Sequence, residues 1–162
     1  MTSAFNPDTF LDQSTTEQGT RRPPVSSGLD FLAVIGEPKA RVVQGKKDPN
    51  ASFVFVDISM TLDLTTHPTE VARVGQEKVT LRHSGSIEYN PDGSLDWSSG
   101  KNRFLTAYRE ALNLNEPGQP FTPRMLIGRI IRAKVGHRPG QETDPTTGAT
   151  VMYDEVNAVT RP

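Results

Sequence analysis

The strongest concentration of one kind of charge lies between Phe121 and Gly140, in the stretch FTPRMLIGRIIRAKVGHRPG. It holds four arginines, one lysine and no acidic residue. On an extended strand, Arg132, Lys134 and Arg138 share one face, because successive side chains alternate between faces. Cations spaced about 7 Å apart along a strand suit a nucleic-acid backbone, whose condensed counterions are released on binding. The alternative is a solvated face paired with acidic residues of the following strand, Asp154 or Glu155.

A second basic group surrounds a predicted turn, GKKDPNA at 45–51. It consists of Lys39, Arg41, Lys46 and Lys47. Lysines in loops are common on any protein surface, so this group supports nucleic-acid binding only through its position relative to the first basic group.

Two aromatic residues could bind unpaired bases. Phe53 and Phe55 fall on the polar side of a strongly alternating segment, opposite its aliphatic row. Exposed aromatic rings on a sheet can stack bases, at about 1–3 kcal/mol for each base. The alternative interpretation is that the two rings pack beneath an N-terminal arm or a loop.

Catalytic chemistry has little support in the sequence. The three histidines, His67, His83 and His137, lack the spacing of known metal sites, and no nucleotide-binding or nucleophile motif is present. Asp57 and Asp63 share a strand face and could bind Mg²⁺ in a nuclease, although polar strand faces often carry such residues. The absence of cysteine excludes disulfides and thiolate ligands. We therefore expect no catalytic residue, no metal site and no cofactor.

The elements that position these residues are mostly strands. Period-two alternation from Phe53 to Leu64 predicts a long strand with one core face, and a second alternating strand spans 77–89, interrupted at Gly85. Residues 29–44 are apolar with a break at 36–38, after which 39–44 form a strand. Helical spacing at 102–114, following a possible N-cap at Ser98 or Ser99, predicts a helix with Tyr108 in the core. Strands at 125–137 and 151–159 flank a long loop, 139–150.

This order predicts a mainly β fold. The closest architecture is an OB-fold-like, five-stranded Greek-key barrel with one α-helix between strands 3 and 4. In that architecture oligonucleotides lie across strands 2 and 3, between the first-to-second and fourth-to-fifth loops. Residues 1–27 are rich in Ser, Thr, Gln and Pro and predict a flexible N-terminal arm, leaving residues 28–162 as the single domain. Phe5, Phe10 and Leu11 indicate that the arm docks, either on its own domain or on another subunit.

Composition limits the class of protein further. The chain has 162 residues, 34% of them hydrophobic, with a mean hydropathy of −0.51 and a formal net charge of −1. Near-neutral charge argues against coating duplex DNA through bulk positive charge, while leaving room for a local basic groove. There is no apolar run long enough to cross a membrane and no signal-peptide pattern at the N-terminus, so we expect a cytoplasmic protein without membrane contact.

Four stretches resemble a family of small tailed-phage proteins associated with single-stranded-DNA binding or recombination. They are FNPDTFLDQSTTEQGT (5–20), NRFLTAYREALNLN (102–115), RMLIGRIIRAKVGHR (124–138) and YDEVNAVTRP (153–162). The resemblance implies an OB-like protein without catalysis, made in the host cytoplasm during infection to coat single strands in replication or recombination. Carried over to this chain, it implies backbone contacts from Arg129, Arg132, Lys134, His137 and Arg138. The chain ends in VTRP, which departs from the acidic tail with a terminal Phe that typical bacterial single-strand binders use to recruit partners.

The combined prediction is a protein that coats single-stranded DNA with little preference for base sequence. The residues predicted to line the DNA path are Lys39, Lys46, Lys47, Phe53, Phe55, Arg82, Arg129, Arg132, Lys134 and Arg138. Expected partners are single-stranded DNA, phage replication or recombination proteins, and a second copy of the chain through the arm. The main alternative is a phage structural or interaction module whose arm mediates assembly. A Mg²⁺-dependent nuclease using Asp57 and Asp63 is a third hypothesis.

Overall fold

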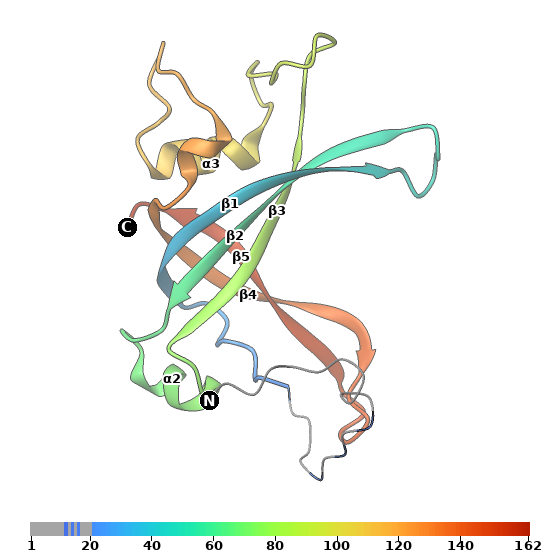
Figure 1. Cartoon of the computed structure of the whole chain (residues 1–162), viewed down its shortest axis with the longest axis vertical. Coiled ribbons are helices and arrows are strands. Elements are labelled where there is room, and N and C mark those ends of the chain that lie inside the picture. Colours follow the sequence, from blue (N-terminus) through green and yellow to red (C-terminus); the bar gives the residue numbers. More distant parts are fainter. Residues whose placement is uncertain (1–11, 13, 15, 17–20) are drawn as a thin grey trace.

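The protein is a mainly β structure built around one antiparallel sheet (Figure 1). The computed structural model describes residues 12, 14, 16 and 21–162. Its strands are β1 (Asp30–Gln44), β2 (Ser52–Asp63), β3 (Lys78–Ile87), β4 (Ile130–Thr143) and β5 (Thr150–Thr160), in the order β3-β2-β1-β4-β5. Helix α2 (Pro68–Val74) lies between β2 and β3, and α3 (Arg103–Ala111) lies between β3 and β4, followed by the 3-10 helix η1 (Pro123–Leu126). The predicted mainly β class is confirmed.

The alternation of β2 reflects burial of one face, as predicted. Val56, Ile58, Met60 and Leu62 are buried, and the residues between them lie on the outer face. β1 carries a register shift between Ile35 and Pro38. The predicted break at 36–38 is therefore a bulge within one continuous strand, because β2 continues to pair with β1 on both sides of it.

Beyond the bulge, the two halves of the sheet separate. β4 pairs with β1 only from Asp30 to Val34, whereas β1 and β2 continue together to Gln44 and Ser52. The β1–β2 hairpin and the β4–β5 hairpin consequently extend from the body in different directions (Figure 1). This arrangement leaves the outer face of β1, β2 and β3 between the two hairpins.

Two element boundaries predicted from the sequence were wrong, and one helix was not predicted. The predicted strand at 125–137 begins only at Ile130, because Pro123 starts a 3-10 helix and Gly128 follows with a positive φ of 74°. Half of the long loop predicted at 139–150 is strand, since β4 runs to Thr143 and β5 begins at Thr150, which leaves 144–149 as the loop. Helix α2, which begins at Pro68, was not predicted, because its seven residues are too few for a helical period to stand out.

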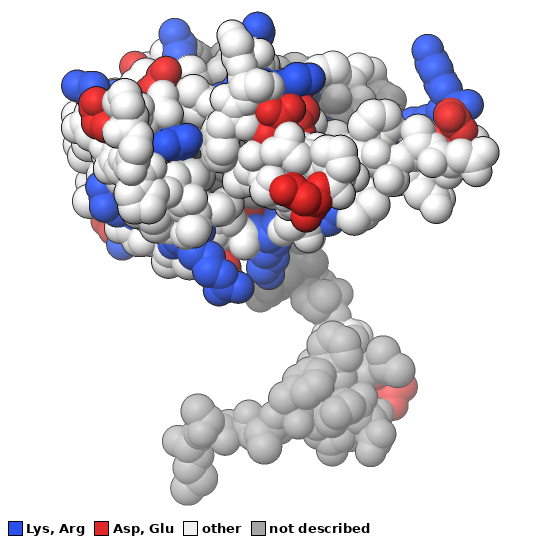
Figure 2. All heavy atoms as spheres, turned by 90° about the horizontal axis from the view of Figure 1, so that it is seen from above, with Lys and Arg blue, Asp and Glu red and all other residues white. Residues whose placement is uncertain are grey.

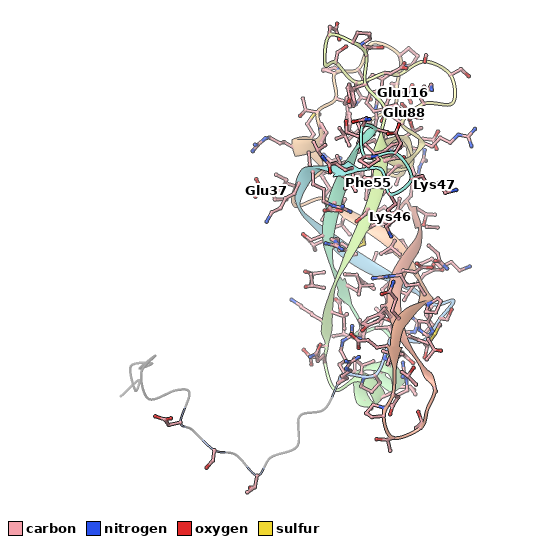
Figure 3. The ribbon with its side chains drawn as sticks, turned by 90° about the vertical axis from the view of Figure 1, so that its right-hand side faces the viewer. Glu37, Lys46, Lys47, Phe55, Glu88 and Glu116 are labelled. Carbon is pink, nitrogen blue, oxygen red and sulfur yellow. The ribbon has the colours of Figure 1, made fainter. Side chains whose placement is uncertain are left out.

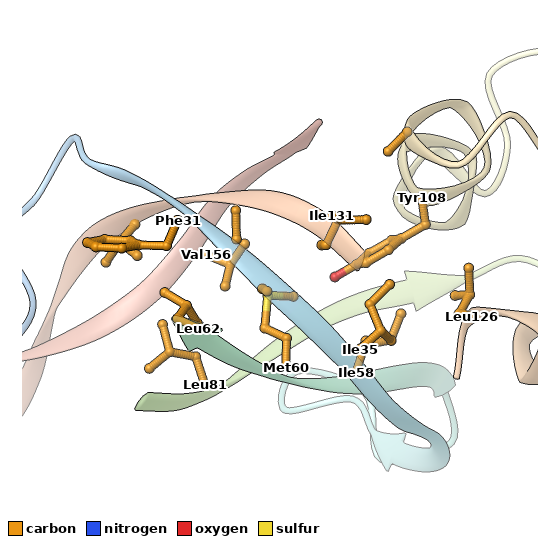
Figure 4. Packing of buried hydrophobic residues seen from close by; sticks show 14 of the residues in the cluster. Phe31, Ile35, Ile58, Met60, Leu62, Leu81, Tyr108, Leu126, Ile131 and Val156 are labelled. Atoms are coloured by element: carbon orange, nitrogen blue, oxygen red, sulfur yellow. The ribbon is translucent and has the colours of Figure 1, made fainter. Parts of the chain in front are cut away.

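Helix α3 packs one face on the sheet. Leu105 and Tyr108 are fully buried there, and Figure 4 shows Tyr108 pointing toward Ile35 and Ile131. The Tyr108 hydroxyl lies 2.7 Å from Nδ1 of His83 on β3. Burial lowers the pKa of His83 to about 4 and raises that of Tyr108, so both groups are neutral at pH 7. The predicted core role of Tyr108 is confirmed.

The N-cap of α3 is Asn102, and the expectation of Ser98 or Ser99 was wrong. Asn102 is fully buried with a φ of 48°, a left-handed conformation that Asn tolerates better than most residues. Its side chain accepts from the Glu88 N–H (3.0 Å) and donates to the carbonyls of Glu88 (2.7 Å) and Asp96 (2.8 Å). Asn102 thereby ties the end of β3 to the start of α3.

The described part of the predicted arm, residues 21–27, packs on the domain. Val25 is fully buried, and its N–H donates to Asp154 Oδ1 at 2.9 Å. Arg22 forms an ion pair with Asp154 at 2.8 Å, and Ser26 donates from both its N–H (2.9 Å) and its hydroxyl (2.5 Å) to Glu70 on α2. Over these residues the segment docks on its own domain and is not a free arm. Phe5, Phe10 and Leu11 lie outside the described residues.

Candidate nucleic-acid interface

The outer face of β1, β2 and β3 collects several of the predicted site residues. The register places Lys39 opposite Asp57, Arg41 opposite Phe55, and Arg82 opposite Ser59. All of these positions are on the opposite face of the strands from the buried aliphatic row of β2, since β-strand side chains alternate. The predicted placement of Phe53 and Phe55 on this face is confirmed.

Arg41 is held in one orientation on this face. Its Nε donates to Asp57 Oδ2 at 2.7 Å, and its guanidinium lies over the Phe55 ring, 5.1 Å from the ring centre. Ser84 on β3 donates to the other carboxylate oxygen of Asp57 at 2.5 Å. The hydrogen bonds from Arg41 and then Ser84 lower the pKa of Asp57, so Asp57 stays ionised. The result is a fixed stack of a cation on an aromatic ring, with the ring half-buried beneath the guanidinium.

A pocket of about 570 Å³ joins this face to the other hairpin. Arg41, Arg82 and Arg138 line it together with His83 and Ser84 of β3 and Asp154 to Val156 of β5. Arg138 also lies over the Tyr153 ring, 5.6 Å from its centre. Three arginines from three strands thus converge, two of them stacked on aromatic rings.

The tip of the β1–β2 hairpin adds exposed cations and apolar surface. Lys46 and Lys47 lie in the turn between the strands (Figure 3), which is closed by the Gly45 N–H donating to the Ala51 carbonyl at 2.8 Å. Phe53 is 52% exposed and Val42 is 69% exposed on this hairpin. Exposed aromatic surface between lysines is the combination that unstacked bases need.

The remaining predicted cations are placed elsewhere. Arg132 and Lys134 lie opposite Leu32 and Asp30 of β1, on the other side of β1 from β2. Arg129 precedes β4 and lines a different pocket with Arg161. The predicted alternation of this strand is confirmed, since Ile131, Ala133 and Val135 are buried and the three cations between and after them are not. Of those cations, Arg132, Lys134 and Arg138, only Arg138 lines the three-arginine pocket.

The sequence-based alternative for these cations, pairing with Asp154 or Glu155, is not observed for Asp154. Its carboxylate accepts from Arg22 and from the Val25 N–H, and it lies 3.6 Å from His137 Nε2. The side chain of Asp154 is 2% exposed, so its charge stabilises the docked N-terminal segment.

Two residues that stack here, Arg41 and Tyr153, are absent from the DNA path predicted from the sequence. The sequence places Arg41 only in the basic group around residues 45–51. Arg41 and Tyr153 become candidates for binding only through their partners on the neighbouring strand, Phe55 for Arg41 and Arg138 for Tyr153. The spacing of aromatic and basic residues on the two hairpins was the only signal that could have identified them.

The geometry does not bring Asp57 and Asp63 together. Asp57 is engaged by Arg41 and Ser84, and Asp63 accepts from the Thr65 hydroxyl at 2.6 Å. Five residues of β2 lie between them, and the six steps along the strand cover about 20 Å. Within the described part of the chain, no group of three or more His, Asp or Glu side chains is placed to hold a metal ion.

Figure 2 shows basic and acidic side chains interspersed over the face seen from above, so positive charge is local rather than continuous. Among residues 12, 14, 16 and 21–162, no helix has the length and apolarity that crossing a bilayer requires. No protein-family model matches this chain, and a search of curated proteins also finds no match.

Proposed function

We propose that this chain is an OB-fold-like protein that binds single-stranded DNA without catalysis, and that it coats single strands in phage replication or recombination. The sheet order supports the architecture. β1 pairs with both β2 and β4. The two outermost strands, β3 and β5, face each other across the three-arginine pocket, an approach that closing a barrel requires.

The convergence of Arg41, Arg82 and Arg138 carries the proposal. Two of these guanidiniums lie over aromatic rings, and Arg41 is additionally fixed by Asp57. Cations that are already oriented lose less side-chain entropy on binding a phosphate, and the neighbouring rings can accept bases. Lys46, Lys47 and Phe53 on the projecting hairpin extend the same combination beyond the pocket.

The direct test is a fluorescence-anisotropy titration of a labelled dT oligonucleotide of about 30 bases with the full chain. We expect saturable binding whose logarithmic affinity falls linearly with the logarithm of salt concentration, and weaker binding to a duplex of equal length. Little difference among mixed-base oligonucleotides is also expected, because stacking tolerates any base. No binding at low salt would refute the proposal and favour the interaction-module alternative.

A double variant locates the path. Arg82→Ala with Arg138→Ala removes two of the converging cations, so the salt slope should decrease by about 1.4 if each contacts a phosphate. Lys78→Ala is a single-charge control, because Lys78 is the first residue of β3, four positions before Arg82, and does not line the three-arginine pocket. A double variant indistinguishable from the control in both affinity and salt slope would refute this site. The same titration on Arg132→Glu with Lys134→Glu decides whether the β4 cations take part.

A further inference from the structure

A second basic and aromatic pocket lies beyond the end of β3, away from the three-arginine pocket. Its volume is about 310 Å³, and it is lined by the loop from Trp97 to Lys101, by α3 and by Asn115. The cations that line it are Lys101, Arg103 and Arg109, and among its described lining residues none is acidic. Glu88 approaches from outside the lining, 4.0 Å from Lys101 Nζ.

Arg109 makes this pocket rigid. Its guanidinium carbon lies 4.6 Å from the centre of the Trp97 ring and 4.9 Å from the centre of the Phe121 ring. Its Nε donates to the Leu114 carbonyl at 2.9 Å. The two rings meet edge to face at 5.9 Å. Trp97 is nevertheless 39% exposed, so part of its surface remains open to a ligand while its orientation is fixed.

The pocket is also fixed relative to the main face. Asn102 hydrogen-bonds to the main chain at Glu88 and Asp96, which joins the end of β3 to the loop that carries Trp97. From Arg82 to Glu88 the strand direction covers about 20 Å. Asn102 therefore holds the loop of Trp97 at the end of β3 that lies beyond Arg82.

We infer that this pocket is a second contact for single-stranded DNA, in which Trp97 stacks a base and Lys101 and Arg103 bind the adjoining phosphates. The inference rests on the proposed function, because it extends the same DNA path. Trp97 is accessible, aromatic and oriented, and the two cations beside it are exposed, with side chains that can move onto a phosphate.

Trp97 supplies its own reporter, because it is the single tryptophan of the chain. Tryptophan emission of the full protein is followed during titration with unlabelled dT of about 30 bases, in parallel with anisotropy of the labelled oligonucleotide. We expect the emission to be quenched with the same midpoint as the anisotropy change. The variant Lys101→Ala with Arg103→Ala should weaken affinity about tenfold at low salt and shift both midpoints together. Lys78→Ala should leave both unchanged.

The outcomes separate the two proposals. If the anisotropy rises while Trp97 emission stays constant at saturation, the second contact is refuted and the proposed function stands. An unchanged midpoint in the Lys101 and Arg103 double variant refutes the second contact as well, even if quenching occurs. If neither signal changes at low salt, the proposed function itself fails. Trp97→Phe keeps an aromatic surface beside Arg109, and it should retain most of the affinity that Trp97→Ala loses.

Discussion

Asn102 and His83 show how single polar residues are satisfied in this small core. The side chain of Asn102 hydrogen-bonds to two backbone groups of Glu88, its N–H and its carbonyl. The backbone N–H of Asn102 also donates to Glu88 Oε2 at 2.5 Å. His83 faces the Tyr108 hydroxyl and packs edge to face on Phe104, with ring centres 4.7 Å apart. Both residues connect β3 to α3, so the outer face of β3 depends on them.

Replacing Asn102 with Ala should lower the free energy of unfolding by about 1–3 kcal/mol more than replacing Asn113 with Ala. The comparison is matched because both residues have a positive φ, 48° and 55°, while Asn113 is exposed. The backbone cost of Ala in the left-handed conformation thus cancels, and the lost hydrogen bonds remain. Urea unfolding followed by circular dichroism gives the difference, and equal losses would contradict the assigned role of Asn102.

The partly buried imidazole of His83 predicts a loss of stability in mild acid. Its pKa is lowered to about 4 by burial, so between pH 6.5 and pH 4 the unfolded chain binds a proton that the folded chain does not. Stability should therefore fall as the pH drops through this window, by at most about 3 kcal/mol. In His83→Gln the loss over the same window should be smaller. Unfolding free energies at pH 7, 5 and 4 provide the test, and equal slopes for both proteins would contradict it.

At the scale of elements, the β1–β2 hairpin projects from the body of the protein (Figure 1). Val56 is the last buried residue of β2 toward the tip of this hairpin. Beyond it, Val42 and Phe53 are exposed, one on each face of the hairpin. The core therefore does not account for apolar residues at the tip, whereas contact with a ligand would. The lysines of the turn add charge at the same place.

Replacing Lys46 and Lys47 with Ala should reduce the salt slope of single-strand binding by about 1.4, if each lysine contacts one phosphate. Thermal stability should stay within about 0.5 kcal/mol of the parent, because exposed loop residues contribute little to folding. Anisotropy titrations at four salt concentrations measure the slope. A loss of affinity accompanied by unfolding would show that the hairpin is structural.

How far the sequence predicts the elements depends on how local each signal is. Strand β2 was predicted closely, because burial of Ile58, Met60 and Leu62 on one face imposes a two-residue hydrophobic period that is visible in the sequence. The start of α3 was predicted to within one residue, but its cap was not, since Asn102 is held there by Glu88, fourteen positions earlier. The site follows the same division: Phe53 and Phe55 were predicted from their strand face, while the stacking of Arg41 on Phe55 depends on pairing between strands.

At the scale of the whole molecule, residues 21–27 connect β5 with α2. Arg22 and Val25 bind Asp154, while Ser26 binds Glu70, which also accepts from Arg73 Nη2 at 2.7 Å. Arg73 in turn donates to the Pro24 carbonyl at 2.6 Å. Two carboxylates that are almost entirely buried thus hold the segment against elements far apart in sequence.

Glu70 should make this arrangement sensitive to strong acid. Chiefly through the Arg73 hydrogen bond, the pKa of Glu70 is lowered to about 2, against an ordinary value of 4.5. The stabilisation is therefore present above pH 4.5 and is lost as the pH falls toward 2, by at most about 3 kcal/mol. Glu70→Gln should be less stable at pH 7 and lose less over this range. Chemical unfolding at pH 5 and pH 3 tests the prediction, and parallel losses in both proteins would contradict it.

The bulge of β1 has a consequence for solubility. Past Pro38, among the described residues, β1 has a ladder partner on one side only, which exposes a strand edge that a second chain could extend. Pro38 offers no N–H to such a partner, the bulge twists the edge, and Lys39 and Arg41 place like charges along it. These features oppose edge-to-edge pairing between two copies of the chain, so the exposed edge of β1 is protected against fibril formation.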